Sequence, residues 1–188
     1  MKPTKIYLSI LSLALASLAC SIFAGGPDYP AQALPYSPNE VINMQTQIEQ
    51  ALAAGAETGV VTLQITESQL TSYMTEKMMA QVDPPFTDPQ VLLRNGQMLM
   101  YGKVTQGFFN ANILITMNVS IDELTGLPKI EIASADFGPL PAPEGINTAM
   151  NAIINEAFTG SLGPVAVGFR LEAITIADGI MTLTGRIK

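Results

Sequence analysis

The chain has 188 residues, 9 basic and 16 acidic side chains, one cysteine and no histidine. Without histidine, the usual catalytic triads and most zinc sites are excluded. The excess of acidic side chains excludes nucleic acid as a partner, because binding to phosphates needs a basic patch.

The first residues follow the order of a signal peptide. Lys2 and Lys5 come before an apolar run over residues 6–19. That run has 14 residues, whereas a transmembrane helix needs about 20. It has the length of the apolar part of a signal peptide. Small residues follow, in the order Ala16-Ser17-Leu18-Ala19-Cys20.

This ending resembles the bacterial lipobox, in which the cysteine receives a diacylglycerol and the chain is cut just before it. Ser17 stands where leucine is usual. The alternative is ordinary secretion with a chance cysteine. Because Cys20 is the only cysteine, the exported domain cannot form an internal disulfide, and the thiol needs another role. We expect acyl chains such as palmitate on Cys20 to hold the protein on the extracytoplasmic face of a cell membrane.

Removal of residues 1–19 leaves 7 basic and 16 acidic side chains, a net charge of −9. That charge opposes electrostatic adhesion to anionic lipids, so attachment would depend on the acyl chains. Residues 20–38 contain Gly25-Gly26-Pro27 and three further prolines, a composition typical of a tether. Residues 39–188 have a length that suits one domain.

Residues 39–54 are predicted to form a helix ended by Gly55, because apolar residues recur on one face, namely Val41, Met44, Ile48 and Leu52. Residues 60–65 alternate as a strand. Thr66 and Gln69 have the spacing of a capping box, and a second helix is expected from there to about residue 81, with Leu70, Tyr73, Met74 and Met78 inward.

The next part of the chain reads as strands. Residues 91–94 and 97–104 flank Asn95-Gly96, which is typical of a tight hairpin turn. Residues 109–121 alternate apolar and polar side chains over 13 residues, which predicts one unusually long strand with one buried face. Residues 129–136 are expected to return as its partner.

Residues 144–158 have the clearest helical periodicity. The closing strand over 165–176 changes phase, which predicts a bulge near Glu172. Asp178-Gly179 then predicts a hairpin into residues 181–187. Residues 91–104 align without gaps to 174–187, either because both converge on a favourable hairpin or because a unit was duplicated. The fold class is α+β, with long amphipathic helices packed on a curved antiparallel sheet.

This order resembles bacterial envelope proteins of the YpmS-like and LmeA-like kind, which are similar to tubular lipid-binding (SMP/BPI-like, TULIP) domains. The resemblance covers residues 58–188 and is carried by Ile65-Thr66-Glu67-Ser68-Gln69-Leu70, Gly138-Pro139-Leu140-Pro141 and residues 174–185. It implies a half-barrel in which a long helix lies in a curved sheet, with an apolar groove for lipid. It assigns no functional residue, and its other members are held by a transmembrane helix.

We therefore expect a non-enzymatic protein without metal or cofactor that binds a lipid or lipid-like molecule. Flexible methionines and the absence of tryptophan suit acyl chains. The candidate groove is lined by Phe109, Ile113, Ile115, Met117, Met150, Ile153, Ile154 and Phe158. Two alternatives stay open: a module with a filled core that docks an envelope protein, and an enzyme acting on envelope glycolipids.

Overall fold

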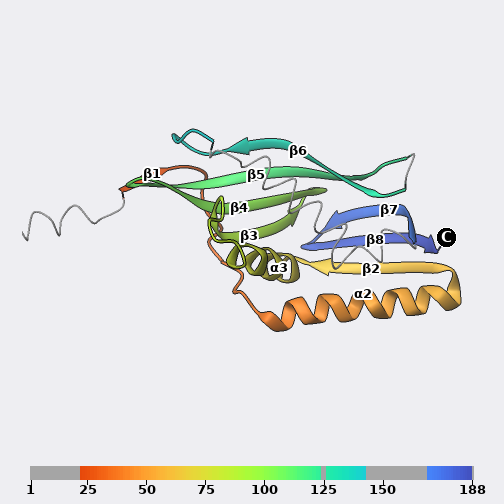
Figure 1. The fold of residues 1–188 in the computed structure, drawn as a ribbon. Coiled ribbons are helices and arrows are strands. Elements are labelled where there is room, and N and C mark those ends of the chain that lie inside the picture. Colours follow the sequence, from red (N-terminus) through yellow and green to blue (C-terminus); the bar gives the residue numbers. More distant parts are fainter. Residues whose placement is uncertain (1–21, 124–125, 143–168, 188) are drawn as a thin grey trace, which may run out of the picture.

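A computed structural model describes residues 22–123, 126–142 and 169–187 of the protein. These residues form a mixed α+β fold with two β-sheets, which are antiparallel apart from one short strand. Figure 1 shows the strands side by side across the molecule, with the described helices on the side away from strand β6 (Pro128–Asp136). The α+β class and the antiparallel sheets expected from the sequence are confirmed.

Helix α2 (Pro38–Thr58) packs against strand β2 (Val60–Thr66). Both elements have the predicted periodicity, because the apolar face of each is buried while its polar face is exposed. The buried residues are Val41, Met44 and Ile48 of the helix and Val61, Leu63 and Ile65 of the strand. The two elements form a helix–strand unit at one side of the molecule (Figure 1).

The end of α2 differs from the prediction. Gly55 lies inside the helix, and the helix ends at Gly59, whose φ is 76° and whose amide donates to the Gly55 carbonyl at 2.7 Å. Gly55 is instead required for close packing, since a Cβ there would lie 2.2 Å from Cγ2 of Val61. The sequence alone does not distinguish a glycine such as Gly55, which allows a helix to contact a strand, from a glycine that ends a helix.

Helix α3 (Glu67–Met79) begins with the predicted capping box. The Thr66 hydroxyl accepts from the Gln69 amide at 3.2 Å, and the Gln69 side chain accepts from the Thr66 amide at 2.9 Å. The helix packs on strand β3 (Thr87–Arg94). There the buried Thr71 hydroxyl accepts a hydrogen bond from the Val91 amide at 2.9 Å.

The larger sheet contains β3, β4 (Gln97–Gln106), β5 (Phe109–Ile121) and β6. Asn95 and Gly96 join β3 to β4 with φ values of 54° and 78°, as a type I′ turn requires. Strand β5 has the bounds predicted from its alternation, and β6 pairs with its second half from Leu114 to Ile121. The hairpin and the long strand are confirmed.

The smaller sheet has the order β2, β8 (Ile180–Ile187), β7 (Phe169–Ala177). Asp178 and Gly179 form the predicted turn, with φ values of 50° and 78°. The register between β7 and β8 shifts between Leu171 and Ala173, which confirms the bulge at Glu172. The helix predicted over residues 144–158 lies outside the described residues.

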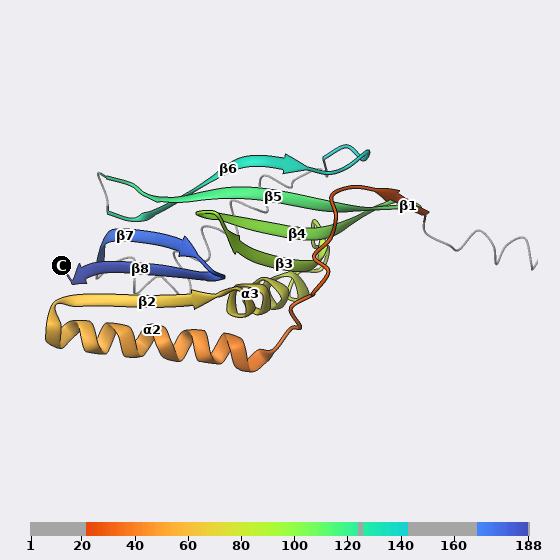
Figure 2. The same cartoon turned by 180° about the vertical axis from the view of Figure 1, so that it is seen from behind.

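The Gly/Pro-rich segment predicted as a tether is attached to the larger sheet over most of its length. Strand β1 (Ile22–Gly25) pairs in parallel with the first residues of β5, on the same edge that β6 occupies further along. Residues 26–37, the crossing segment, then run across the sheet to α2 (Figure 2). Gly26 allows this approach, because its φ is 117° and a Cβ there would lie 2.3 Å from the Asn112 carbonyl oxygen.

Four hydrogen-bonded positions fix the crossing segment to successive elements. Asn112 of β5 donates to the Pro27 carbonyl at 3.0 Å, and Tyr29 donates to the Asp88 carbonyl of β3. Gln90 of β3 bonds both backbone groups of Leu34, at 2.6 and 3.0 Å. The Ser37 amide donates to the Ser72 hydroxyl of α3 at 3.2 Å. The prediction of a free tether over residues 20–38 therefore needs correction for residues 22–37. In that range the glycine- and proline-rich chain is hydrogen-bonded to the larger sheet and to α3.

Candidate functional site

The candidate lipid-binding face is the apolar face of the larger sheet. Cross-strand pairs place Met100 opposite Ile115 and Met98 opposite Met117, and β3 adds a third row beside them. Because directly opposed residues share a face, these side chains form one continuous surface. We call it the apolar face; its members are Val91, Leu93, Met98, Met100, Gly102, Val104, Ala111, Ile113, Ile115 and Met117.

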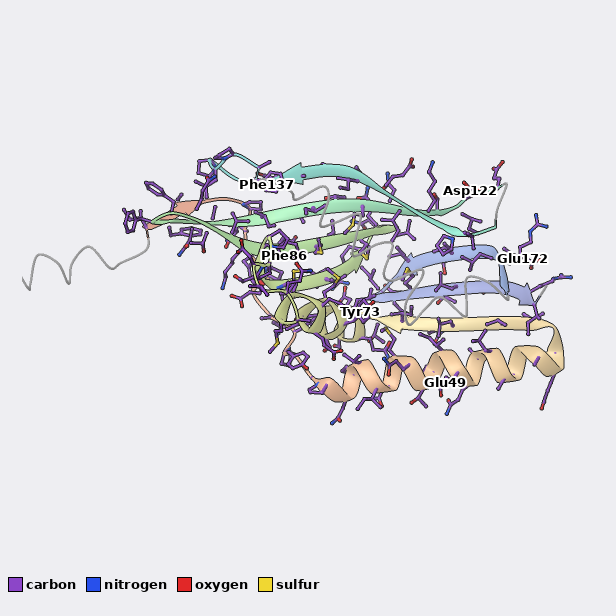
Figure 3. The ribbon with its side chains drawn as sticks, viewed as in Figure 1. Glu49, Tyr73, Phe86, Asp122, Phe137 and Glu172 are labelled. Carbon is purple, nitrogen blue, oxygen red and sulfur yellow. The ribbon has the colours of Figure 1, made fainter. Side chains whose placement is uncertain are left out.

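Most of the apolar face is buried within the protein. Ile113, Ile115 and Met117, three of the predicted groove residues, are almost completely buried. Phe86 is equally buried and lies over Gly102, where a Cβ would come within 2.6 Å of its ring. Figure 3 shows Phe86 close to β3 and α3. The glycine therefore provides the space that this ring occupies.

The other predicted site residues are placed differently or not described. Phe109 is exposed, because it is the first residue of β5 and lies at the end of the sheet. Met150, Ile153, Ile154 and Phe158, the helical half of the predicted groove, lie outside the described residues, as does Cys20. The structure thus brings together Ile113, Ile115 and Met117 and leaves Phe109 apart from them.

An open groove of about 410 Å³ lies elsewhere, between α2 and β2. The groove runs between the polar side of α2 and the edge strand β2, so both polar and apolar side chains line it. The lining residues are Gln47, Gln50, Ala51, Thr62, Leu63 and Gln64. With three glutamines among six residues, this groove lacks the apolar lining of a lipid site.

Sequence reasoning did not identify the buried polar residues that hold the crossing segment. Ser72 and Gln90 are both buried, and they bond the backbone of Ser37 and of Leu34. The bonded partners lie 35 and 56 positions away along the chain, so no local pattern signals this role.

Tyr29, in the crossing segment, lies between an aromatic ring and two charged side chains. Its ring meets Tyr101 edge-on, with centroids 6.1 Å apart, and the Lys103 ammonium lies 5.2 Å from its centroid. Burial, together with the nearby Asp88 carboxylate, raises the pKa of Tyr29 to about 12. The phenol is therefore a hydrogen-bond donor at physiological pH, in keeping with a structural contact.

Within the described ranges, no three acidic, cysteine or histidine side chains come together as a metal site would require. No helix among the same residues has both the length and the apolar character to cross a membrane. No protein-family model matches the chain, and no curated protein matches it. Function must therefore be inferred from this chain's own geometry.

Proposed function

We propose that this protein is a bacterial lipoprotein, anchored through acyl chains on Cys20 to the extracytoplasmic face of a membrane, and that its domain binds a lipid or lipid-like molecule without catalysis. The domain would be a half-barrel of the tubular lipid-binding kind. The ligand would lie along the apolar face of the larger sheet, against Ile113, Ile115 and Met117.

The observation that carries this proposal is the direction of the apolar face relative to the expected anchor. Strand β5 begins at Phe109, which pairs with Ile22, two residues after Cys20. The strand then continues for 13 residues, about 40 Å at 3.3 Å per residue. The apolar face, which includes the adaptable side chains of Met98, Met100 and Met117, therefore extends along β5 from the end of the sheet nearest the expected anchor.

A second function is favoured by a different observation. The side chains of Ile113, Ile115 and Met117 are almost completely buried by the chain itself, so a ligand on the apolar face would have to displace the side chains that cover it. A domain with a permanently filled core would instead act as an interaction module that docks an envelope protein. The two functions differ in whether the apolar face opens to lipid.

Native mass spectrometry of the exported chain from Ser21 to Lys188 separates them. Residues before Pro38 must be kept, because they include β1 and the crossing segment. We expect the protein, made in a lipid-producing host, to carry co-purifying lipid. A lipid-free protein would support the interaction module.

The variant Ile115→Trp sharpens this test. If lipid lies on the apolar face, the indole enters ligand space, so lipid is displaced and the melting temperature falls little. If the core is filled, overpacking costs about 1–3 kcal/mol of the free energy of unfolding. Asn118→Trp, at an exposed position of the same strand, is the matched control and should leave both lipid content and stability unchanged. Strong destabilisation by Ile115→Trp in a lipid-free protein would contradict lipid binding.

A further inference from the structure

Four large apolar side chains are exposed together at the end of the larger sheet where the described chain begins. Ile22 is 56% exposed, Phe23 63%, Phe108 67% and Phe109 47%. Ile22 pairs with Phe109, and its amide donates to the Phe108 carbonyl at 2.7 Å. We call these four residues the apolar tip.

The backbone geometry at the apolar tip does not require apolar side chains there. The turn from β4 to β5 has two residues, Gly107 and Phe108, and glycine is needed at its first position, where φ is 62°. Phenylalanine is not needed at the second, where polar residues are usual. Because strand neighbours alternate, Ile22 and Phe109 lie on one face of the sheet and Phe23 on the other. The end of the sheet is therefore apolar on both sides.

The surroundings of the tip suit a lipid surface better than water. No charged residue occurs in Ile22–Gly26 or in Thr105–Asn112, although the chain as a whole is acidic. The polar neighbours are neutral, namely Thr105, Gln106, Asn110 and Asn112. Such a border avoids both the cost of burying charge and the repulsion that acidic residues would experience at an anionic membrane.

The position of the tip in the chain identifies its partner. Ile22 follows Cys20 by two positions, so their Cα atoms are at most about 7 Å apart. Pairing of Ile22 with Phe109 brings the turn to the same place. If Cys20 carries acyl chains that are inserted in a bilayer, the tip must lie at the surface of that bilayer.

We propose that the apolar tip, Ile22, Phe23, Phe108 and Phe109, inserts into the lipid interface beside the acyl chains of Cys20 and fixes the orientation of the domain on the membrane. This inference rests on the proposed lipid anchor. A flexible connection would let the domain tumble freely, whereas a second apolar contact holds one end of the sheet against the lipid. The apolar face of β5 would then begin at the membrane surface.

Site-directed fluorescence tests this proposal on the intact lipidated protein. Acylation consumes Cys20, the only cysteine, so the variant Phe108→Cys offers one free thiol for an environment-sensitive dye. The protein is reconstituted in phosphatidylcholine vesicles with and without doxyl-labelled lipid. We expect a shift of emission to shorter wavelength and loss of most of the fluorescence to the doxyl quencher.

The control is Glu172→Cys, an exposed position on β7 at the end of the molecule opposite to β1 (Figure 3). Its dye should be neither shifted nor quenched. Phe23→Cys, on the other face of the sheet, gives an independent reading should the Phe108 variant fold poorly, and we expect it to behave as Phe108→Cys does.

The outcomes separate the tip from the anchor. Protein that enters the vesicles with both tip dyes unquenched overturns the tip proposal while the lipid anchor stands. Protein that carries no acyl group and stays out of the vesicles overturns the anchor itself. Quenching at the tip and at Glu172→Cys alike would also contradict a fixed orientation.

Discussion

Glu67 is the residue that joins three parts of the fold. Its carboxylate accepts hydrogen bonds from the Leu93 amide at 2.6 Å and from the Arg94 guanidinium. Its amide donates to the Gly179 carbonyl at 3.2 Å. The first turn of α3 therefore connects the two matched hairpins, one in each sheet, at their turns. The side chain is largely buried, at 13% exposure.

We predict that Glu67→Ala lowers the free energy of unfolding by about 1–3 kcal/mol, because it leaves the Leu93 amide without an acceptor. Chemical denaturation measures the change. The matched control is Glu172→Ala, which removes an ion pair to Arg186 between exposed side chains and should cost less than about 1 kcal/mol. Equal effects of the two variants would contradict the role of Glu67.

Gly55 offers a second prediction at this scale. Alanine is usually better than glycine inside a helix by about 1 kcal/mol, yet a Cβ at Gly55 would lie 2.2 Å from Val61. We predict that Gly55→Ala destabilises the protein by about 1–3 kcal/mol through overpacking. Ala54→Ser, at the exposed neighbour, should change stability by less than about 0.5 kcal/mol. A more stable Gly55→Ala protein would refute the close contact of α2 with β2.

The raised pKa of Tyr29 predicts that the stability of the folded protein depends on pH. Its pKa is about 12 in the folded protein and 10.0 in a model phenol, so the folded state holds its proton more tightly. The stability that Tyr29 contributes is complete below pH 10.0 and is lost as the pH rises toward about 12. Ultraviolet titration should show one late tyrosine that is missing in Tyr29→Phe. Identical titration curves for the two proteins would rule out the buried contact to Asp88.

At the scale of the element, β5 allows its two faces to be compared directly. We predict that Ile115→Asp costs several kcal/mol or prevents folding, because a carboxylate would be buried without a partner. Asn118→Asp keeps the acceptor for Gln97, whose amide nitrogen lies 3.0 Å from the Asn118 oxygen, and should stay within about 0.5 kcal/mol. Thermal unfolding provides the measurement, and similar melting temperatures for both variants would contradict the observed alternation.

The elements with local signals could be predicted from the sequence. Strand β5, the two hairpin turns, the capping box at Thr66 and the bulge at Glu172 each depend on residues close together in the chain. Their side-chain period, positive φ or reciprocal hydrogen bonds are properties of a few consecutive residues. The same holds for three of the candidate site residues, since Ile113, Ile115 and Met117 follow from the period of one strand.

The elements that depend on distant partners could not be predicted. Strand β1 depends on the pairing of Ile22 with Phe109, 87 positions later. Gly26 allows the backbone to lie close to Asn112, whereas from composition alone this glycine indicates a flexible segment. Gly55 was read as a terminator for the same reason. Phe109 was assigned to the buried face by its period, but its place at the end of the sheet leaves it exposed.

At the scale of the whole molecule, the proposals describe one arrangement. The crossing segment replaces a loose connection by a docked one, so the domain begins two residues after the expected anchor. The apolar tip lies at that end, where β1 runs beside the start of β5 (Figure 1). The apolar face extends from there along β5. Anchoring, orientation and ligand binding would therefore all depend on the same end of the larger sheet.

The lipid anchor on Cys20 is the claim from which this arrangement follows, and mass spectrometry of the mature N-terminus tests it most directly. The membrane fraction of an expressing bacterium is digested and its N-terminal peptide sequenced. We predict a peptide that starts at Cys20 and carries a diacylglyceryl group on the sulfur, and no membrane-bound protein from a Cys20→Ser variant once the leader is cleaved. A mature chain that starts at another residue, or that has an unmodified Cys20, would contradict the account.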